Sequence, residues 1–269
     1  MKNRNAKRIL AAGAAAVLAV GLTACGGKEN KADDKTITVA ASPTPHAEIL
    51  EAAKDLLKEK GYTLEIKEFD DYPQQNVVVD EGEFDANYFQ HQPYLDNFNE
   101  EKGSDLVSAA KIHYEPLGIY PGASEDLENI KDGAKIAVPN DATNEARALL
   151  LLEENGIITL KEDAGLNATK KDVEENPHNI EIVELDAAQI ARVVEELDFV
   201  VLNGNYALDA GFNVQTDAIA KEEADSEAAQ TYANIIAVKK ENKDSEKIKA
   251  LVEVLQSEEI GKFITDTYE

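Results

Sequence analysis

One stretch decides the fold: Lys135-Ile-Ala-Val-Pro-Asn-Asp-Ala-Thr-Asn-Glu-Ala-Arg147-Ala-Leu-Leu-Leu-Leu152. Its first residues, Ile136 to Val138, predict a short buried strand, and a loop that contains proline follows. Asp141 is suited to cap the N-terminus of a helix, which is expected to run through the four leucines. Gly156 suits the position just after the end of that helix. The stretch therefore predicts a strand–loop–helix unit of an α/β protein.

Arg147 lies on the core-facing side of this predicted helix. Asn144 and Arg147 are three residues apart and share a face, which Leu150 and Leu151 continue as an apolar stripe. A guanidinium in line with the core needs an anion, and the helix N-terminus beside it also favours negative charge. We therefore interpret this corner as a carboxylate-binding site. The alternative is an arginine paired with an acidic side chain of the protein itself, because buried charges are usually paired.

A second unit of the same plan begins at Thr36. Residues 36–41 alternate as in a strand, and a Ser-Pro-Thr-Pro loop follows, in which Pro45 suits the first position of a helix that runs to about Lys60. Two such units about 95 positions apart predict two similar α/β lobes. Ligands of open α/β sheets bind beyond the carboxyl ends of the strands, so both proline loops are expected to border one cleft.

The composition narrows the class of function. The chain has 269 residues, enough for two domains, and 43% of them are hydrophobic. The formal net charge is −26, and it becomes −30 without the four basic residues of the first 24 positions. Such a charge argues against nucleic acid and against direct adsorption on anionic lipid.

The N-terminus has the pattern of a targeting segment. A basic stretch from Lys2 to Arg8 precedes 14 apolar or small residues, Ile9 to Leu22, which are too few to span a bilayer. Leu-Thr-Ala-Cys-Gly then resembles a bacterial lipobox around Cys25, the single cysteine of the chain. We expect residues 1–24 to be a lipoprotein signal peptide, Cys25 to be lipidated, and residues 25–35 to form a tether. The alternative is an ordinary cleaved signal with an incidental cysteine.

Metal binding and catalysis find little support in the sequence. The chain has four histidines, none paired at i and i+4, so we expect no metal site and no cofactor. A Gly-x-Ser-x-Gly elbow is absent from the sequence, and 53 acidic residues make any pairing of carboxylates uninformative. We expect the protein not to be an enzyme.

Aromatic and amide residues gather near the ends of predicted strands. Five aromatic residues lie within 23 positions of a chain that is only 6% aromatic: Tyr72, Tyr88, Phe89, His91 and Tyr94. Strand-end amides recur at Asn87, Asn203, Asn205 and Asn234. Together with Arg147 they could bind a small zwitterion with an apolar tail. Core packing of each aromatic ring, and capping or turn formation by each asparagine, are the competing explanations.

These residues carry a family resemblance. Four blocks, in this order, resemble the methionine-binding lipoprotein (NlpA) family: Ala40 to Leu50, Asn87 to Leu95, Pro139 to Asn144 with Arg147, and Asn203 to Ala207. Members of that family are the substrate-binding components of bacterial methionine ABC importers. The resemblance implies a two-lobed periplasmic-binding-protein-like fold of type II, with the ligand cleft between the lobes. It covers the chain from the lipobox to the last predicted helix.

The resemblance also implies a set of ligand-binding residues. The pocket for the ligand's side chain would be lined by Tyr72, Phe89, His91 and Tyr94. Arg147 would bind the carboxylate, and the polar end of the amino acid would be surrounded by Asn144, Asn203 and Asn234. The ligand would be L-methionine or a close analogue.

The expected protein is a monomer anchored through Cys25 on the extracytoplasmic face of the cell membrane. It would deliver its ligand to an ABC permease and its ATPase. Lobe 1 is expected to span residues 36–118, lobe 2 residues 119–231, and the return to lobe 1 residues 232–269. A binder of a methionine-containing dipeptide or another amino acid is one alternative. A surface adhesin or signalling lipoprotein is an alternative of another class.

Overall fold

A computed structural model describes residues 35–223 and 227–268. The predicted signal peptide and Cys25 lie outside the described residues, and so does all of the predicted tether except Lys35. Among the residues that the structure describes, no helix is both long enough and apolar enough to cross a membrane.

The first sheet has the strand order β2-β1-β3-β12-β4. Its strands are β1 (Thr36–Ala41), β2 (Thr63–Glu68), β3 (Ala86–His91), β4 (Leu106–His113) and β12 (Asn234–Lys239). β1 runs parallel to β2 and β3, whereas β12 is antiparallel to both β3 and β4. All six residues of β3 are buried, because this strand lies at the centre of the sheet with helices over both faces.

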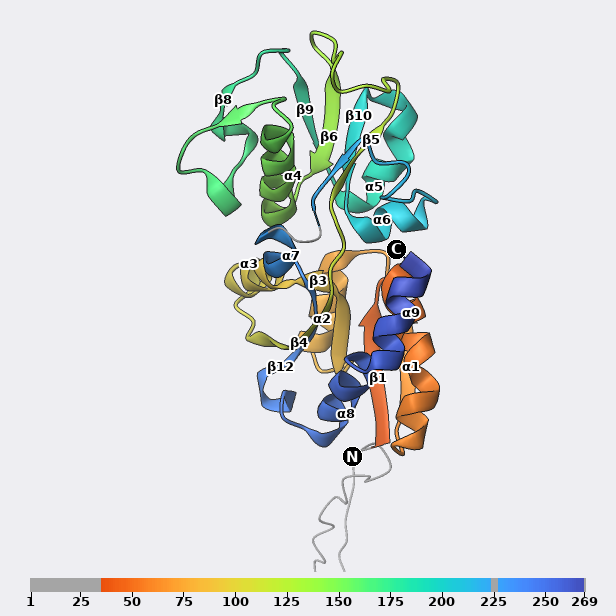
Figure 1. The fold of residues 1–269 in the computed structure, drawn as a ribbon. Coiled ribbons are helices and arrows are strands. Elements are labelled where there is room, and N and C mark those ends of the chain that lie inside the picture. Colours follow the sequence, from red (N-terminus) through yellow and green to blue (C-terminus); the bar gives the residue numbers. More distant parts are fainter. Residues whose placement is uncertain (1–34, 224–226, 269) are drawn as a thin grey trace, which may run out of the picture. The chain divides into compact units, whose positions relative to one another are not determined.

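Helices cover both faces of this sheet. α1 (Glu48–Glu59) packs against α8 (Glu246–Leu255) and α9 (Glu258–Tyr268), and Figure 1 shows the three together beside β1. Contacts with the central strands are also made by α2 (Tyr72–Asp80) and α3 (Gln92–Lys102). α1 is amphipathic and buries Ile49, Leu50, Ala53 and Leu57, the spacing of one helical face.

The second sheet has the strand order β11-β5-β10-β6-β9. Its strands are β5 (Gly118–Pro121), β6 (Lys135–Pro139), β9 (Glu181–Leu185), β10 (Phe199–Leu202) and β11 (Ala220–Lys221). The helices on this side of the chain are α4 (Ala142–Glu154), α5 (Ala187–Ile190) and α6 (Gly204–Asp209). β6 followed by α4 is the strand–loop–helix unit predicted from the sequence (Figure 1).

The remaining elements are short. β7 (Thr159–Leu160) pairs with β8 (Val173–Glu175), and α7 (Glu227–Thr231) leads into β12. The remaining short helical segments have one or two turns: η2 (Pro43–Ala47), η3 (Gly165–Asn167), η4 (Lys170–Asp172), η5 (Ala191–Glu196) and η6 (Lys240–Asn242). Each sheet has its own main apolar core, one under α1 and α8 and one under α4.

Local signals placed the ends of α4 correctly. The carboxylate of Asp141 accepts a hydrogen bond from the backbone N–H of Asn144 at 3.0 Å, and Gly156 has a φ of +69° just beyond the helix. The prediction for Pro45 is confirmed as well. Thr44, directly before it, has extended backbone angles of φ −128° and ψ 141°, and helical backbone runs from Pro45 through the end of η2 into the regular helix α1 at Glu48.

The chain crosses between the sheets twice. It leaves β4 at His113 and enters β5 at Gly118, and it returns from β11 to β12 through α7. The two separate sheets correspond to the two α/β lobes that the sequence predicts. The predicted lobe limits, 36–118, 119–231 and 232–269, stay predictions.

Candidate functional site

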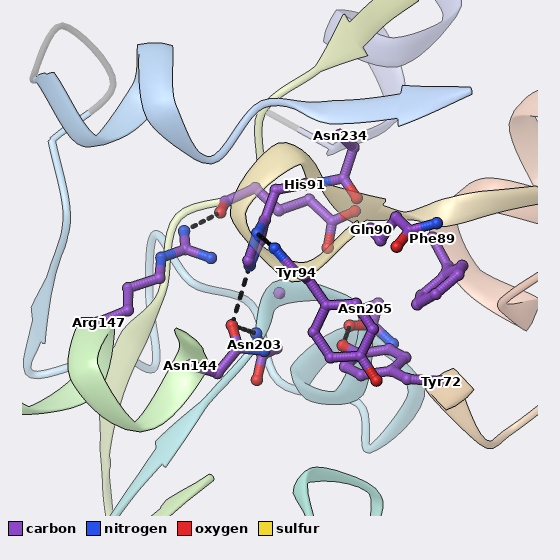
Figure 2. A pocket seen from close by; sticks show the side chains of 12 residues that line it. Tyr72, Phe89, Gln90, His91, Tyr94, Asn144, Arg147, Asn203, Asn205 and Asn234 are labelled. Atoms are coloured by element: carbon purple, nitrogen blue, oxygen red, sulfur yellow. Dashed lines mark hydrogen bonds between the residues drawn. The ribbon is translucent and has the colours of Figure 1, made fainter. Parts of the chain in front are cut away.

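One pocket is lined by residues that belong to both halves of the chain. All eight residues predicted as ligand-binding line it, and Figure 2 shows them together: Tyr72, Phe89, His91, Tyr94, Asn144, Arg147, Asn203 and Asn234. Four further residues complete the lining: Gln90, Glu115, Gly204 and Asn205. The open space is only about 20 Å³, about enough for one water molecule. A larger ligand therefore requires the walls to separate.

Strand and helix ends bring these residues together. Phe89 and His91 lie at the carboxyl end of β3, and Asn203 directly follows β10. Asn144 lies in the first turn of α4, and Asn234 begins β12 beside His91. The ends of strands from both sheets thus meet at one place, as expected for a ligand site in an open α/β fold.

Aromatic rings form one wall of the pocket. The Tyr72 ring lies 5.2 Å from Phe89, 5.7 Å from Tyr94 and 4.9 Å from Tyr206, measured between ring centroids. Tyr206, which the sequence did not single out, belongs to the second half of the chain. Its hydroxyl donates to the backbone carbonyl of Asp70 at 2.8 Å. The wall is therefore shared between the two sheets.

Tyr72 makes a second contact across the pocket. Its hydroxyl donates a short hydrogen bond to the side-chain oxygen of Asn205. Asn205, in the first turn of α6, therefore holds the ring of Tyr72, which lies at the start of α2. Asn87 is different. It lies outside the pocket lining, where its amide donates to Asn76 at 2.8 Å and to the backbone of Gln75 at 3.1 Å. Of the four strand-end amides, Asn87 has a structural role.

His91 has a defined tautomer. Its Nδ1 accepts a hydrogen bond from the backbone N–H of Tyr94 at 3.2 Å and so caps α3, which leaves the proton on Nε2. Nε2 donates to the side-chain oxygen of Asn144 at 3.1 Å (Figure 2). Burial lowers the pKa of His91 to about 3, and the nearby charge of Arg147 acts in the same direction. His91 is therefore neutral at physiological pH.

Asn144 connects three parts of the site. Its oxygen also accepts from the Asn203 amide at 2.9 Å, and its own amide donates to both oxygens of Asp141 at 2.9 and 3.0 Å. Asn203 Oδ1 is buried and has no hydrogen-bond partner among the described residues. A buried acceptor without a partner is costly, so this atom is suited to an N–H donor of a ligand.

Arg147 already has an acidic partner. Its Nε donates to Glu222 Oε1 at 2.7 Å and its Nη2 to Glu222 Oε2 at 2.5 Å. Both side chains are buried, with exposed fractions of 4% and 6%. Nη2 also donates to the backbone carbonyl of Glu115 at 2.9 Å, and the guanidinium lies 4.3 Å from the centre of the Tyr232 ring. The alternative considered from the sequence, an arginine paired within the protein, is therefore present. A ligand role for Arg147 stays a prediction.

The ion pair between Arg147 and Glu222 stabilises the charged form of each side chain. Burial lowers the pKa of Arg147, but the charge of Glu222 and the hydrogen bonds to it outweigh this effect and raise the pKa. Burial raises the pKa of Glu222, but the charge of Arg147 and the hydrogen bonds that the carboxylate accepts hold it below its usual range.

Glu115 stands at the centre of a second buried network. Its Oε1 lies 3.1 Å from His46 Nε2 and 2.8 Å from His113 Nε2. His113 Nδ1 lies 2.5 Å from the hydroxyl of Tyr88, and His46 Nε2 also contacts the oxygen of Asn234 at 3.1 Å. Burial raises the pKa of Glu115, but the two histidines outweigh this effect and hold it below the usual range. Glu115 is therefore an ionised carboxylate.

Gly204 gives Glu115 its space. A Cβ added at Gly204 would lie 2.7 Å from Glu115 Cβ and 2.8 Å from Glu115 Oε2. Any larger residue at the start of α6 would press on the carboxylate. The absence of a side chain at Gly204 therefore allows the two halves of the pocket to approach closely.

One group of described residues could in principle hold a metal ion: His46, His113 and Glu115. Their donor atoms lie within 4.8 Å of one another. The distances of 2.8 and 3.1 Å are those of direct hydrogen bonds between histidine nitrogen and carboxylate oxygen. The arrangement needs no ion to explain it, and the expected lack of a metal site stays a prediction.

Sequence reasoning missed the two acids of the site. Glu115 and Glu222 are two of 53 acidic residues, and neither lies in a recognisable motif. The position of Glu115, between a strand end and Pro116, is a weak signal that resembles many loop positions. The sequence patterns include Asn205 among the strand-end amides and Gln90 in the block that begins at Asn87, and they assign no role to either.

Comparisons with known proteins show the family of this chain. A family model described as NlpA lipoprotein matches residues 37–269. The methionine-binding lipoprotein MetQ of Bacillus subtilis is 43% identical over 263 residues, 96% of this chain and 95% of that protein. Membrane lipoprotein TpN32 of Treponema pallidum is 37% identical, over 93% of this chain and 91% of its own length.

Solved structures are similar as well. A putative lipoprotein from Ruminococcus gnavus superposes with a TM-score of 0.86 at 67% identity, covering 87% of this chain and 96% of that one. A nutrient-binding protein from Burkholderia cenocepacia, described as bound to methionine, has a TM-score of 0.81 at 43% identity, covering 86% and 96%. The predicted two-lobed binding-protein fold is confirmed.

Proposed function

Because this chain belongs to the NlpA lipoprotein family, we propose that it is a substrate-binding protein that delivers L-methionine or a close analogue to an ABC importer. The observation that carries the proposal is the convergence of the eight predicted residues on one pocket between the two sheets. A relative with 43% identity, whose structure is described as bound to methionine, supports the same ligand class.

The pocket is chemically suited to an amino acid with an unbranched apolar side chain. The rings of Tyr72, Phe89 and Tyr94 offer edges and faces to a thioether, which packs favourably against aromatic rings. Asn203 and Glu115 offer acceptors to an ammonium group, and Arg147 lies at the same polar end. The proposed role is binding without catalysis, and it requires neither a cofactor nor an activated nucleophile.

Lobe closure on the ligand is the proposed mechanism. The contacts that cross the pocket come from both sheets, including Tyr206 to Asp70 and His91 to Asn144. A ligand that touches both walls stabilises the closed arrangement, because only differential contact shifts such an equilibrium. Hinge bending at the two crossings of the chain would open the pocket. Lipidation of Cys25 would anchor the protein on the extracytoplasmic face of the membrane, beside the permease.

Ligand identity can be tested directly. Mass spectrometry of the small molecules released from denatured protein should find methionine. Calorimetric titration of ligand-free protein should show that methionine binds about ten- to a hundredfold more tightly than alanine, because burial of its side chain contributes about 1.5–3 kcal/mol. X-ray scattering should show compaction with methionine.

Other outcomes would overturn the proposal. Equal binding of methionine and alanine, or no compaction at saturation, would exclude selective clamping. A methionine-containing dipeptide or another amino acid among the released molecules would replace methionine as the ligand. An absence of any bound or binding small molecule would favour an adhesin or signalling role.

A further inference from the structure

A second cavity lies between the two halves of the chain, next to the candidate site. Its volume is about 160 Å³, whereas the pocket of the predicted ligand-binding residues has an open space of about 20 Å³. One wall is formed by α6 and the loop after it, and another by the carboxyl end of α9, which lies beside α6 in Figure 1. A cavity of about 150 Å³ can hold a six-membered aromatic ring. The protein thus has a ring-sized space that the proposed function does not use.

Apolar side chains from both halves of the chain form much of the wall of this second cavity. Leu208, Phe212 and Val214 contribute from the side of the second sheet, and Pro45 and Ile264 from the side of the first. Side chains that face an unfilled space lack contacts there, so an apolar occupant would gain burial and dispersion contacts on both sides.

A buried hydroxyl without a partner belongs to the same wall. Tyr120, in β5, lines the second cavity and is fully buried, and its hydroxyl has no hydrogen-bond partner among the described residues. Its ring is fixed between the bare backbone of Gly118, where an added Cβ would lie 2.9 Å from Cε2, and the ring of Phe212, whose centroid is 5.3 Å away. Burial raises the pKa of Tyr120, so the hydroxyl keeps its proton. An unpaired buried hydroxyl is costly, which favours an occupant with a hydrogen-bonding group.

The second cavity shares a wall with the candidate site. Glu115 and Gly204 line both spaces. The two histidines beside Glu115 hold its pKa below the usual range, so its carboxylate is ionised and repels an anionic occupant. The apolar wall disfavours a charge of either sign, and the second cavity is therefore suited to a neutral molecule.

We propose that the second cavity binds a neutral, ring-sized apolar molecule with one hydroxyl group, and that this occupant strengthens ligand binding in the neighbouring pocket. The second site goes beyond the proposed function and does not depend on it, whereas the coupling rests on it. An occupant that touches both halves of the chain stabilises their closed arrangement, because differential contact shifts such an equilibrium. Coupling between two sites is reciprocal, so each ligand strengthens the binding of the other.

Phenol is the test ligand, because it is a neutral six-membered ring with one hydroxyl group. Full-length protein with labelled methyl groups is titrated with phenol by NMR, with and without saturating methionine. Shifts should concentrate on Leu208, Val214 and Ile264, and the Kd should be on the order of 1 mM for so small a ligand. Both ligands should bind together, and saturating phenol should lower the Kd of methionine by about fivefold or more in calorimetry.

Variants establish where phenol binds. Leu208→Trp fills the second cavity and should abolish phenol binding, whereas Leu166→Trp, at a leucine that is 50% exposed, should leave it unchanged. Tyr120→Phe should weaken phenol by about threefold to tenfold and leave the affinity for toluene unchanged, because toluene has the same shape without the hydroxyl group. Circular dichroism establishes whether each variant is folded, and Val214→Trp replaces Leu208→Trp if the latter is not.

The outcomes separate the second site from the proposed function. Displacement of phenol by methionine would place phenol in the candidate site and overturn the inference, as would an absence of phenol binding or binding that the cavity-filling variant leaves intact. Phenol binding that the cavity-filling variant abolishes, without any change in the affinity for methionine, supports the second site and overturns the coupling. The same phenol result in a protein that does not bind methionine overturns the proposed ligand and leaves the second site.

Discussion

The buried pair of Arg147 and Glu222 allows a demanding test of the structure. Glu222→Gln keeps the size of the side chain and removes its charge. The carboxylate accepts four hydrogen bonds in the structure, two from Arg147, one from Tyr114 at 2.6 Å and one from the backbone N–H of Leu117 at 2.9 Å. In the variant the amide nitrogen has to face one of these donors, and the guanidinium stays buried without a counter-charge.

The magnitude follows from burial. Removal of one partner of a buried ion pair typically costs about 3–5 kcal/mol, because the remaining charge is left uncompensated. For a domain of this size, about 1 kcal/mol shifts the melting temperature by about 2–4 °C. Glu222→Gln should therefore lower the melting temperature by about 6–20 °C in differential scanning calorimetry.

An exposed pair supplies the control. Glu253 accepts a hydrogen bond from Lys60 at 2.8 Å, a distance similar to those in the buried pair, but 69% of its side chain is exposed. Glu253→Gln should cost less than about 1 kcal/mol, because solvent screens such pairs. The double variant Arg147→Met with Glu222→Leu should recover part of the loss, because no buried charge remains. A melting-temperature change for Glu222→Gln no larger than for Glu253→Gln would refute the argument from burial.

Three further results are expected. The free energy of unfolding should fall as the pH drops from about 6.5 to 5. Burial lowers the pKa of His91 to about 3, so in this range only the unfolded state gains a proton on this ring. In urea titrations of His91→Gln, the slope of the unfolding free energy against pH should be smaller than in the wild type by up to about 1.4 kcal/mol per pH unit. Gly204→Ala should weaken methionine binding in calorimetry, because its Cβ would lie 2.7 Å from Glu115 Cβ, whereas Gly261→Ala, with open space around the added carbon, should not. Cys25→Ala should leave the protein in the soluble fraction of the cell, and unchanged membrane fractionation would contradict the lipidation of this residue.

Much of the fold could be predicted because its signals are local. The alternation in residues 36–41, the cap at Asp141 and the glycine at position 156 each act within a few residues of the chain. Local sequence therefore indicated where β1 and α4 lie and that two similar units exist. Pro45 is a further local signal, because helical backbone begins at this residue, directly after the extended Thr44.

The list of pocket residues could also be predicted. Six of the eight lie in the motif blocks, and Tyr72 and Asn234 belong to the aromatic and amide patterns near predicted strand ends. The hydrogen-bond and ion-pair partners of these residues could not be predicted. Arg147 was open to two interpretations, a ligand or an internal acid, and the partner that the structure shows is 75 positions away on the return crossing of the chain. With 53 acidic residues in the chain, no spacing rule selects Glu222.

The sequence by itself determined the α/β class, the repeated strand–loop–helix unit and the residue types available to a zwitterion. Only the tertiary structure decided how those residues are paired, because β12 returns from the second half of the chain to lie between β3 and β4. That insertion brings Asn234 to His46, while the first crossing carries Glu115 to the same place. Hydrogen bonds between such distant segments depend on which strand ends become neighbours, and this is a property of topology that periodicity and capping do not encode.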